Sequence, residues 1–268
     1  MNPTNQDLHL TRIRAAGLLL LAVPSSGFAA PPDGQLFEHT PDRAWVETYD
    51  PTLVSSRLGA ELSYEGYDDD GDYWKIENTI RWGMPLCDDL ALGIQMMAPL
   101  KWTETATDEA FGLGDLELRG GVVGRLSPTL RYGFAVNAVI DSATDPLLGD
   151  NAFILRPIIA VRWDVSERVT LGCNLEYNFT PLEEGDCDVS AIELKFPLAF
   201  KINEDWSAAL SFNPRWDLLA ETDRQRLELG ATRVWGSDNQ YALSFGTEIP
   251  LGSESFEVKF VTGFNWYF

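Results

Sequence analysis

The sequence predicts an all-β fold, a transmembrane antiparallel up-and-down β-barrel of about 12 strands. Three observations predict it: alternation of apolar and polar residues, segments too long for ordinary globular strands, and connections that alternate between short and long. The mean hydropathy is −0.13, and no window approaches the roughly 18 apolar residues of a transmembrane helix. A barrel strand nevertheless gives a weak hydropathy signal, because its apolar residues alternate with polar ones. A soluble β-sandwich is the competing interpretation.

The last segment shows the alternation most clearly. One parity of 256–268 is apolar and aromatic, and the other contains Glu257, Lys259, Gly263 and Asn265. A period of two places the two sets on opposite faces of a strand. This segment resembles the closing strand of bacterial outer-membrane barrels, whose terminal Phe marks them for assembly. The resemblance implies that the barrel assembly machinery is a partner and that the assembly signal is Phe264, Trp266 and Phe268.

Before the first strand, the chain has two segments without barrel alternation. Residues 1–29 form a signal peptide, with Arg12 and Arg14 before an apolar core and a small-x-small cleavage site ending at Ala29. Residues 30–52 are proline-punctuated and read as an irregular periplasmic segment. The barrel is therefore predicted over 53–268. Whether 30–52 plugs the barrel is left open by the sequence.

The first six strands are each justified by an apolar set of one parity. The sets are Leu58, Leu62 and Tyr64 in 53–64; Trp74, Ile76, Ile80 and Trp82 in 73–84; Leu92, Ile94, Met96 and Leu100 in 90–101; Leu116, Leu118 and Val122 in 114–126; Tyr132, Phe134, Val136 and Ile140 in 129–140; and Phe153, Leu155, Ile159, Val161 and Trp163 in 152–164. Such period-two sets are typical of strands with two different environments.

The last six strands follow the same rule. Their apolar sets are Leu171, Leu175, Tyr177 and Phe179 in 168–179; Ile192, Leu194, Phe196 and Phe200 in 189–201; Trp206, Leu210, Phe212 and Trp216 in 205–216; Leu227, Leu229 and Trp235 in 224–235; Tyr241, Leu243, Phe245 and Ile249 in 240–250; and Val258, Phe260, Phe264 and Trp266 in 256–268. The total is even, as single-chain bacterial barrels require.

Strand length and connection length favour the barrel over the sandwich. Most segments run to roughly 11 to 13 residues, whereas globular strands have a mode of about 5 to 6. A tilted strand needs roughly 9 to 11 residues to cross a bilayer. Connections after even strands are tight, whereas most others are longer, which is the pattern of periplasmic turns and outer loops. The longer ones are 65–72, 102–113, 141–151, 180–188 and 217–223. Aromatic residues also gather at strand ends, as in interfacial girdles.

Parity also sorts the charged residues. Fourteen Lys and Arg side chains have the inward parity: Arg57, Lys75, Arg81, Lys101, Arg119, Arg125, Arg131, Arg156, Arg162, Lys195, Lys201, Arg215, Arg226 and Lys259. The inward acids are fewer: Glu61, Glu77, Asp115, Glu117, Glu176, Glu193, Glu228, Glu248 and Glu257. The net charge of −21 comes mainly from the outer loops. An acidic rim over a basic-leaning lumen is therefore predicted.

Two interpretations of this lumen remain open. The first is a packed interior in which charges on neighbouring strands neutralise one another. The second is a narrow pore whose basic rows favour anions, as charged rings do in channels. For the pore, the candidate solute-pathway residues are Arg81, Arg119, Arg131, Arg156, Arg162, Lys195, Arg215, Glu176 and Glu193. The sequence does not identify the solute or the oligomeric state.

The acidic loops suggest a weak metal site. Asp68, Asp70 and Asp72 crowd oxygen ligands around a glycine, as calcium loops do, although the twelve-residue pattern with its closing Glu is missing. The rim could equally gather cations that bridge to lipopolysaccharide phosphates, making outer-membrane lipid and lipopolysaccharide expected partners. Cys87, Cys173 and Cys187 lack metal-ligand spacing and are interpreted as incidental thiols. No cofactor is expected.

Enzymatic and nucleic-acid functions are disfavoured. The two histidines, His9 and His39, both precede the barrel, so a Ser-His or Asp-His arrangement within it would lack its base. Gly112–Asp115 is too short for a phosphate loop and begins a strand rather than a helix. The lack of a basic stripe argues against nucleic acid.

Several motifs together resemble a known group. They are Thr79–Gly83, Cys87–Leu92, Phe111–Leu118 and Leu171–Tyr177. In this order they are similar to the transporter-like outer-membrane family labelled "MetA-pathway of phenol degradation", over roughly residues 40–268. The chain departs from that family at Asp141–Pro146, where a Pro-Thr-Gly-Asp-like stretch is expected. The resemblance implies an outer-membrane barrel with a transport role and supplies no binding residues.

These observations together predict an outer-membrane channel for small solutes in a Gram-negative-type bacterium, with anions favoured. The alternative is a non-conducting structural or surface-interaction barrel with acidic, cation-binding outer loops.

Overall fold

The computed structural model describes residues 52, 54–67, 71–105, 107–181, 188–236, 240–252 and 256–268, and only the backbone at Tyr67, Phe256 and Glu257. The predicted signal peptide and nearly all of the predicted periplasmic segment 30–52 lie outside these residues. Whether that segment plugs the barrel is therefore not tested. In the part of the chain that is described, no helix has the length and apolarity needed to cross a membrane.

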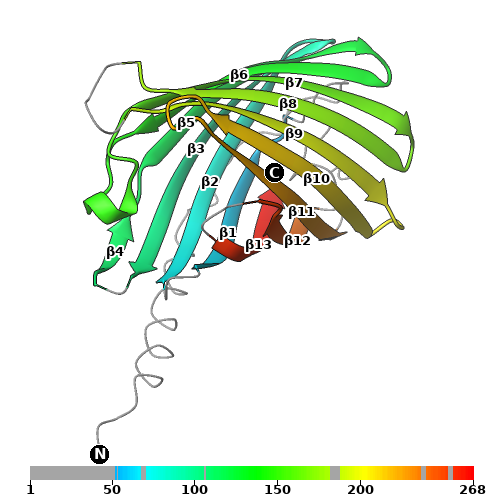
Figure 1. Ribbon diagram of the computed structural model, residues 1–268. Helices are drawn as coiled ribbons and strands as arrows, with labels where there is room; N and C mark the ends of the chain where they lie inside the picture. Colours follow the sequence, from blue (N-terminus) through cyan, green and yellow to red (C-terminus); the bar gives the residue numbers. More distant parts are fainter. Residues whose placement is uncertain are drawn as a thin grey trace, which may run out of the picture. The chain divides into compact units, whose positions relative to one another are not determined.

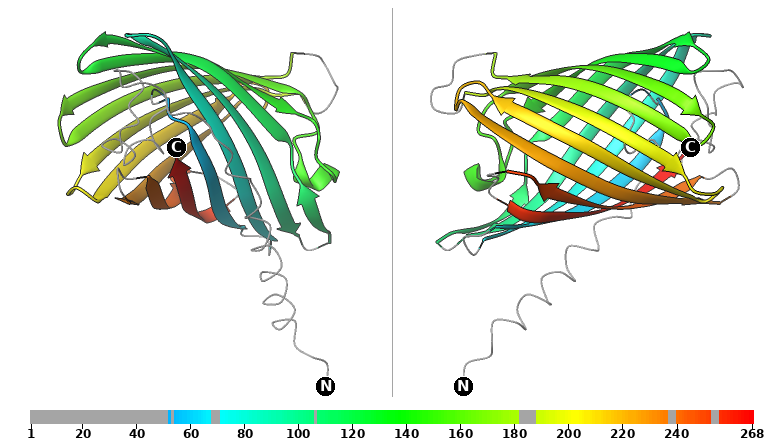
Figure 2. Two further views of the ribbon diagram at one scale, coloured as in Figure 1. Left: turned by 180° about the vertical axis from the view of Figure 1, so that it is seen from behind. Right: turned by 45° about the vertical axis from the view of Figure 1, so that its right-hand side comes forward.

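The described chain is almost entirely strand, and the strands close into one antiparallel barrel (Figures 1 and 2). The strands are β1 (Arg57–Tyr67), β2 (Gly71–Cys87), β3 (Leu90–Glu104), β4 (Glu109–Leu113), β5 (Leu116–Ser127), β6 (Leu130–Ile140), β7 (Ile154–Ser166), β8 (Val169–Phe179), β9 (Ser190–Lys201), β10 (Trp206–Asp217), β11 (Thr222–Trp235), β12 (Tyr241–Pro250) and β13 (Phe256–Tyr267). Each strand pairs with its sequence neighbour, except that β3 pairs with both β4 and β5. Pairing of β13 with β1 closes the ring, so the barrel has twelve strands when β4 and β5 count as one.

Alternating burial explains why these sequences form a barrel. Along β7, Ile159 is 46% exposed, whereas the next residue, Ala160, is 2% exposed. The large apolar residues on the exposed parity of every strand require an apolar surrounding. A closed sheet also leaves no strand edge with unpaired backbone groups, the condition for spanning lipid. The prediction of about twelve barrel strands is confirmed.

One predicted strand differs from the structure. The segment 114–126 was expected to form one uninterrupted strand preceded by a loop. In the structure, β4 and β5 occupy one strand position, β4 lies toward the long loops, and Gly114–Asp115 separates the two. The Asp115 carboxylate is 3% exposed. It accepts backbone hydrogen bonds from Ser142 and Ala143, both at 3.0 Å, and from Asp150 at 2.6 Å. Asp115 therefore binds the loop 141–151 instead of continuing the ladder.

The glycines beside Asp115 let this loop approach the strand. A Cβ on Gly112 would collide with Thr144 and lie 3.2 Å from Leu148. Leu148 belongs to the short helix η2 (Pro146–Leu148) and is fully buried. Gly112–Asp115 and Asp141–Pro146, two stretches that stand out in the sequence, thus contact each other at the outer end of the barrel.

Aromatic side chains form clusters near the two ends of the strands, as predicted. At the end with the short turns, hereafter the short-turn end, Trp235 and Tyr241 stack at 5.9 Å and Phe264 lies 6.2 Å from each ring. At the opposite, long-loop end, Tyr177 stacks on Phe179 at 5.2 Å. Arg233, the cation with outward parity, lies 5.8 Å from the Trp206 ring. These positions suit interfacial girdles.

Candidate functional site: the lumenal wall

Arginine and amide side chains form a continuous row on the inner wall. In register across β1, β2, β3, β5, β6 and β7, the row runs Arg57, Arg81, Gln95, Arg119, Asn137 and Arg156. Because the strands are tilted, this row climbs from the short-turn end at Arg57 toward the long-loop end at Arg156. Arg81 donates from Nε to the Gln95 amide oxygen at 2.8 Å. The candidates Arg81, Arg119 and Arg156 therefore belong to one structural feature.

A second group of arginines lies at the short-turn end. Arg125, Arg131 and Arg162 are direct neighbours on β5, β6 and β7. Arg131 and Arg162 are each 2% exposed. Arg162 donates from Nε to Asp164 at 2.9 Å, so part of this positive charge is compensated. The candidates Arg131 and Arg162 are thus packed into the wall rather than extended into open space.

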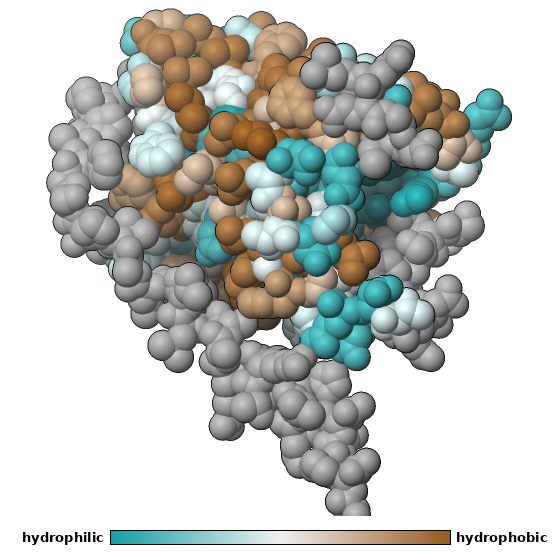
Figure 3. All heavy atoms as spheres, turned by 90° about the vertical axis from the view of Figure 1, so that its left-hand side faces the viewer, coloured by the Kyte–Doolittle hydropathy of each residue, from teal (hydrophilic) through white to brown (hydrophobic). Residues whose placement is uncertain are grey.

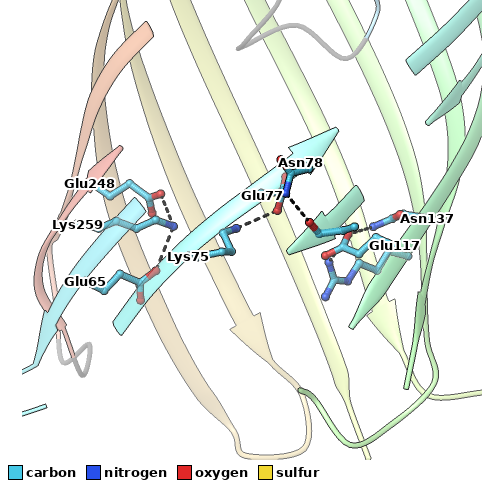
Figure 4. A network of polar contacts seen from close by, with 10 residues as sticks. Glu65, Lys75, Glu77, Asn78, Glu117, Asn137, Glu248 and Lys259 are labelled. Carbon is cyan, nitrogen blue, oxygen red and sulfur yellow. Dashed lines mark hydrogen bonds and ion pairs between the residues drawn. The ribbon is translucent and has the colours of Figure 1, made fainter. Parts of the chain in front are cut away.

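The acids of the inner wall form partly water-accessible ion pairs. Lys259 bridges Glu248 at 2.9 Å and Glu65 at 3.2 Å (Figure 4). Lys75 pairs with Glu77 at 3.0 Å on the neighbouring part of the wall. The side chains of these pairs are only 14–20% exposed, so the pairs are more shielded from water than surface salt bridges are.

Glu117 connects the acids to the arginine row. It accepts from the Asn137 amide at 2.6 Å (Figure 4). Arg156 lies 3.5 Å from the same carboxylate. Arg156 also lies 3.6 Å from Asp150, in the loop that Asp115 holds. The outer end of the row is therefore neutralised on two sides.

The candidates Lys195, Arg215, Glu176 and Glu193 lie together on β8, β9 and β10. Glu193 is the cross-strand neighbour of both Glu176 and Arg215. Lys195 lies 3.3 Å from Glu193, and its side chain is 43% exposed although it points inward. Inward accessibility of a lysine indicates that the side chains of the described residues do not fill the lumen at this level.

Like charges face each other on neighbouring strands more often than a packed, mutually neutralising interior predicts. The like-charge neighbours are Arg57 with Arg81, Glu61 with Glu77, Lys75 with Lys101, Arg125 with Arg131, Arg131 with Arg162, Glu176 with Glu193, Arg215 with Arg224, and Glu228 with Glu248. The opposite-charge neighbours are Glu193 with Arg215, Glu248 with Lys259, and Lys259 with Glu65. Directly opposed like charges are destabilising in a sheet. Stability of the wall therefore does not explain this arrangement.

The arginines of β5–β7 face a wall of mixed charge. Strand order places β6 opposite β12, where Glu248 pairs with Lys259 and Arg226. Viewed from the side of η2 and the long loops, hydrophilic residues gather near the middle of the molecule (Figure 3).

The chain just before β1 also lies against the inner wall. Thr52 and Val54 are buried, and Val54 packs with Ala91 and Val123. The Val54 side chain would lie 3.5 Å from a Cβ on Gly93, and Thr52 would lie 3.6 Å from one on Gly133. The small residues of β3, β5 and β6 therefore make room for the Thr52 and Val54 side chains inside the barrel.

A cavity of about 60 Å³ lies between this segment and the arginine row. The residues that line it include Val54, Gly93, Gln95, Arg119, Gly133 and Ile158. Among the described residues, Arg119 makes no ion pair, and its Nε is buried without a hydrogen-bond partner. Sequence parity placed Arg119 inside the barrel but gave no sign of the cavity, which depends on Val54 and on strand register.

The predicted metal and cysteine sites are only partly described. Asp68, Asp70 and Cys187 lie outside the described residues. Asp72 accepts a hydrogen bond from the Tyr64 hydroxyl at 2.7 Å. No group of three or more potential metal ligands occurs in the part of the chain the structure covers. Cys87 and Cys173 are free thiols and both are exposed. The assembly residues Phe264, Trp266 and Phe268 lie at the short-turn end, where Phe268 donates its backbone N–H to Ser56.

Comparison with solved structures shows an outer-membrane barrel fold. An outer-membrane channel from Pseudomonas putida F1 matches with a TM-score of 0.69 and 13% identity, covering 92% of this chain and 100% of that one. The NanC porin matches with a TM-score of 0.57 and 9% identity, over 78% and 98% of the two chains. The translocator domain of the autotransporter NalP from Neisseria meningitidis gives 0.52 and 12%, over 84% and 93%.

These similarities concern the fold alone, and a translocator domain shares it with channels. No family model matches the chain. No curated protein matches it either. The "MetA-pathway" resemblance is therefore not confirmed, whereas the outer-membrane type of barrel is.

Proposed function

We propose that the chain is a narrow outer-membrane channel for small solutes, with anions favoured. One observation carries the proposal: the closed barrel has an apolar outer face and a charged inner wall on which side chains such as Lys195 stay accessible to water. The like-charge rows support it further, because they are unfavourable for stability and suited to a field acting on solutes.

The anion preference rests on the arginine row and on its neighbours at the short-turn end. Arg119 has the neutral Gln95 and Asn137 as its cross-strand neighbours. Several glutamates elsewhere on the inner wall are held by lysines. A small anion passing along β3–β7 would therefore meet positive charge over successive strands.

The location follows from the same features. Similarity to barrels described as outer-membrane channels and porins, together with the predicted signal peptide, supports an outer membrane of the Gram-negative type. Lipid, lipopolysaccharide and the barrel assembly machinery are the proposed partners. An enzymatic role is not proposed, because the sequence from Thr52 onward has no histidine.

Planar-bilayer recording of the purified barrel tests the proposal. We expect discrete conductance steps and, across a KCl gradient, a reversal potential that indicates anion preference. Arg131→Glu combined with Arg156→Glu should reduce or invert that preference. Arg168→Glu, at an exposed short turn, is the matched charge control and should change it little. Cation preference of the unmodified barrel would contradict the role given to the arginines.

A non-conducting structural barrel is the second candidate. The burial of Arg131 and Arg162, with Thr52 and Val54 seated on the nearby wall, favours a filled lumen at the short-turn end. This function predicts no conductance steps above background for barrels whose folding is verified by heat-modifiable gel mobility.

A further inference from the structure

The cavity beside Arg119 has the features of a binding site rather than of a packing defect. Its volume of about 60 Å³ corresponds to about two water molecules at roughly 30 Å³ each. A carboxylate group that carries one or two further carbon atoms, as in acetate or propionate, has a similar size. One edge carries the Arg119 guanidinium, and the rest is formed largely by small and aliphatic residues, including Gly93, Gly133 and Ile158.

Two polar side chains that can donate hydrogen bonds, Arg119 and Gln95, line this edge. The buried Nε of Arg119 has no hydrogen-bond partner, and among the described residues no carboxylate forms an ion pair with this side chain. The Gln95 amide oxygen already accepts from Arg81, which leaves the amide nitrogen as a donor. A buried N–H group without a partner is costly, and an anion that a small shift of the Arg119 side chain brought within reach would remove that cost.

The nearest acid along β5 is engaged elsewhere. Glu117, two residues before Arg119 on β5, accepts from Asn137 and lies beside Arg156. The remaining lining residues offer no other charge to Arg119 than the like-charged Arg81. The site therefore selects an anionic group at one edge and an apolar body over Val54 and Ile158.

From this geometry we infer that the cavity is a lumenal binding site for small monocarboxylates, with Arg119 and Gln95 holding the carboxylate. Arginine holds a planar carboxylate through two parallel hydrogen bonds, which a spherical anion such as chloride does not reproduce. The inference rests on the proposed function, because the lumen must admit the anion, and it specifies the class of solute.

The test uses the full barrel in nonionic detergent and [1-¹³C]propionate, with the line width of the carboxyl carbon as the readout. Propionamide is the neutral isostere. We expect propionate to bind with a dissociation constant of about 1 mM. Propionamide should bind at least about tenfold more weakly, since charge-assisted bonds are roughly twice as strong as neutral ones.

Two variants separate the site from general attraction to positive charge. Arg119→Gln should weaken propionate binding about tenfold or more, whereas Arg233→Gln, which removes a guanidinium from the outer face, should not change it. Gly133→Ala adds a methyl group to the cavity without changing charge. The new Cβ at position 133 would have ordinary contacts of 3.6 Å or more, so Gly133→Ala should fold. This variant therefore still tests the site if Arg119→Gln does not fold. It should also weaken propionate binding.

Equal propionate binding by the unmodified protein and either lumenal variant would overturn the inference, as would equal binding of propionamide. Failure of the channel proposal gives a different result. A barrel that binds propionate in these ratios but shows no conductance would retain the site and refute the channel. A barrel that conducts anions but does not bind propionate would retain the channel and refute the site.

Discussion

Replacing Asp115 is expected to release the loop 141–151 from the barrel wall without unfolding the barrel. The buried carboxylate accepts three backbone hydrogen bonds, from Ser142, Ala143 and Asp150. Asp115→Ala removes both acceptor oxygens and with them all three bonds, whereas Asp115→Asn keeps one uncharged acceptor oxygen and turns an amide donor toward the same N–H groups.

The magnitude follows from the nature of these bonds. A hydrogen bond to a charged group contributes roughly 1.5–3 kcal/mol. Bonds that share one carboxylate are not additive, so we expect a loss of about 3 kcal/mol in the free energy that holds the loop closed. At about 1.4 kcal/mol per factor of ten, loop opening becomes roughly a hundredfold more frequent.

Hydrogen exchange measured by mass spectrometry on the folded barrel checks this value. Peptides covering 141–151 should exchange about a hundredfold faster in Asp115→Ala, because local opening governs amide exchange. A peptide covering β6, residues 130–140, is the internal control and should stay protected. Unchanged protection of the loop would refute the assigned role of Asp115. Loss of protection in β6 as well would show that Asp115 supports the whole barrel instead.

Three other predictions concern the membrane and the strand order. Val161→Arg, on the outer face of β7, should lower the free energy of unfolding in lipid by roughly 2–4 kcal/mol, whereas Ala160→Ser on the inner face should lower it by less than about 1 kcal/mol; denaturant titration in vesicles measures both. Deletion of Phe268 should reduce the fraction of chains that acquire heat-modifiable mobility in cells, and an unchanged fraction would remove the assembly role of the terminal aromatic residue. Cys87 and Cys187, predicted at opposite ends of the barrel, should form no intramolecular disulfide in the folded protein, and its detection by mass spectrometry after non-reducing digestion would contradict the strand order.

The sequence predicts the barrel well because the alternation of apolar and polar residues is a property of each strand by itself. Ile159 and Val161 face outward while Ala160 and Arg162 are buried, as period-two alternation requires. The interruption at Gly114–Asp115 was missed for the opposite reason. Its cause is a set of hydrogen bonds to residues 142, 143 and 150. Such contacts leave no mark on the alternation of β5.

Within the lumen, parity identified the inward side chains but not their neighbours. That Arg119 lies beside Gln95 and Asn137, or that Glu176 faces Glu193, depends on the register of each strand pair. Register is fixed by turn geometry and ring closure rather than by composition. The position of Val54 against the wall was likewise not predicted, since this residue was assigned to the start of the first strand.

The central claim is that the inner wall meets water while the outer face meets lipid, and Lys195 and Phe196 test it most directly. These neighbours on β9 are exposed to a similar extent, 43% for the Lys195 side chain and 42% for Phe196. After Cys87, Cys173 and Cys187 are replaced by Ser, the barrel carrying Lys195→Cys or Phe196→Cys is inserted in lipid vesicles and treated with a charged thiol reagent. The account predicts rapid modification at position 195 and almost none at 196. Modification at 196 with protection at 195 would contradict it.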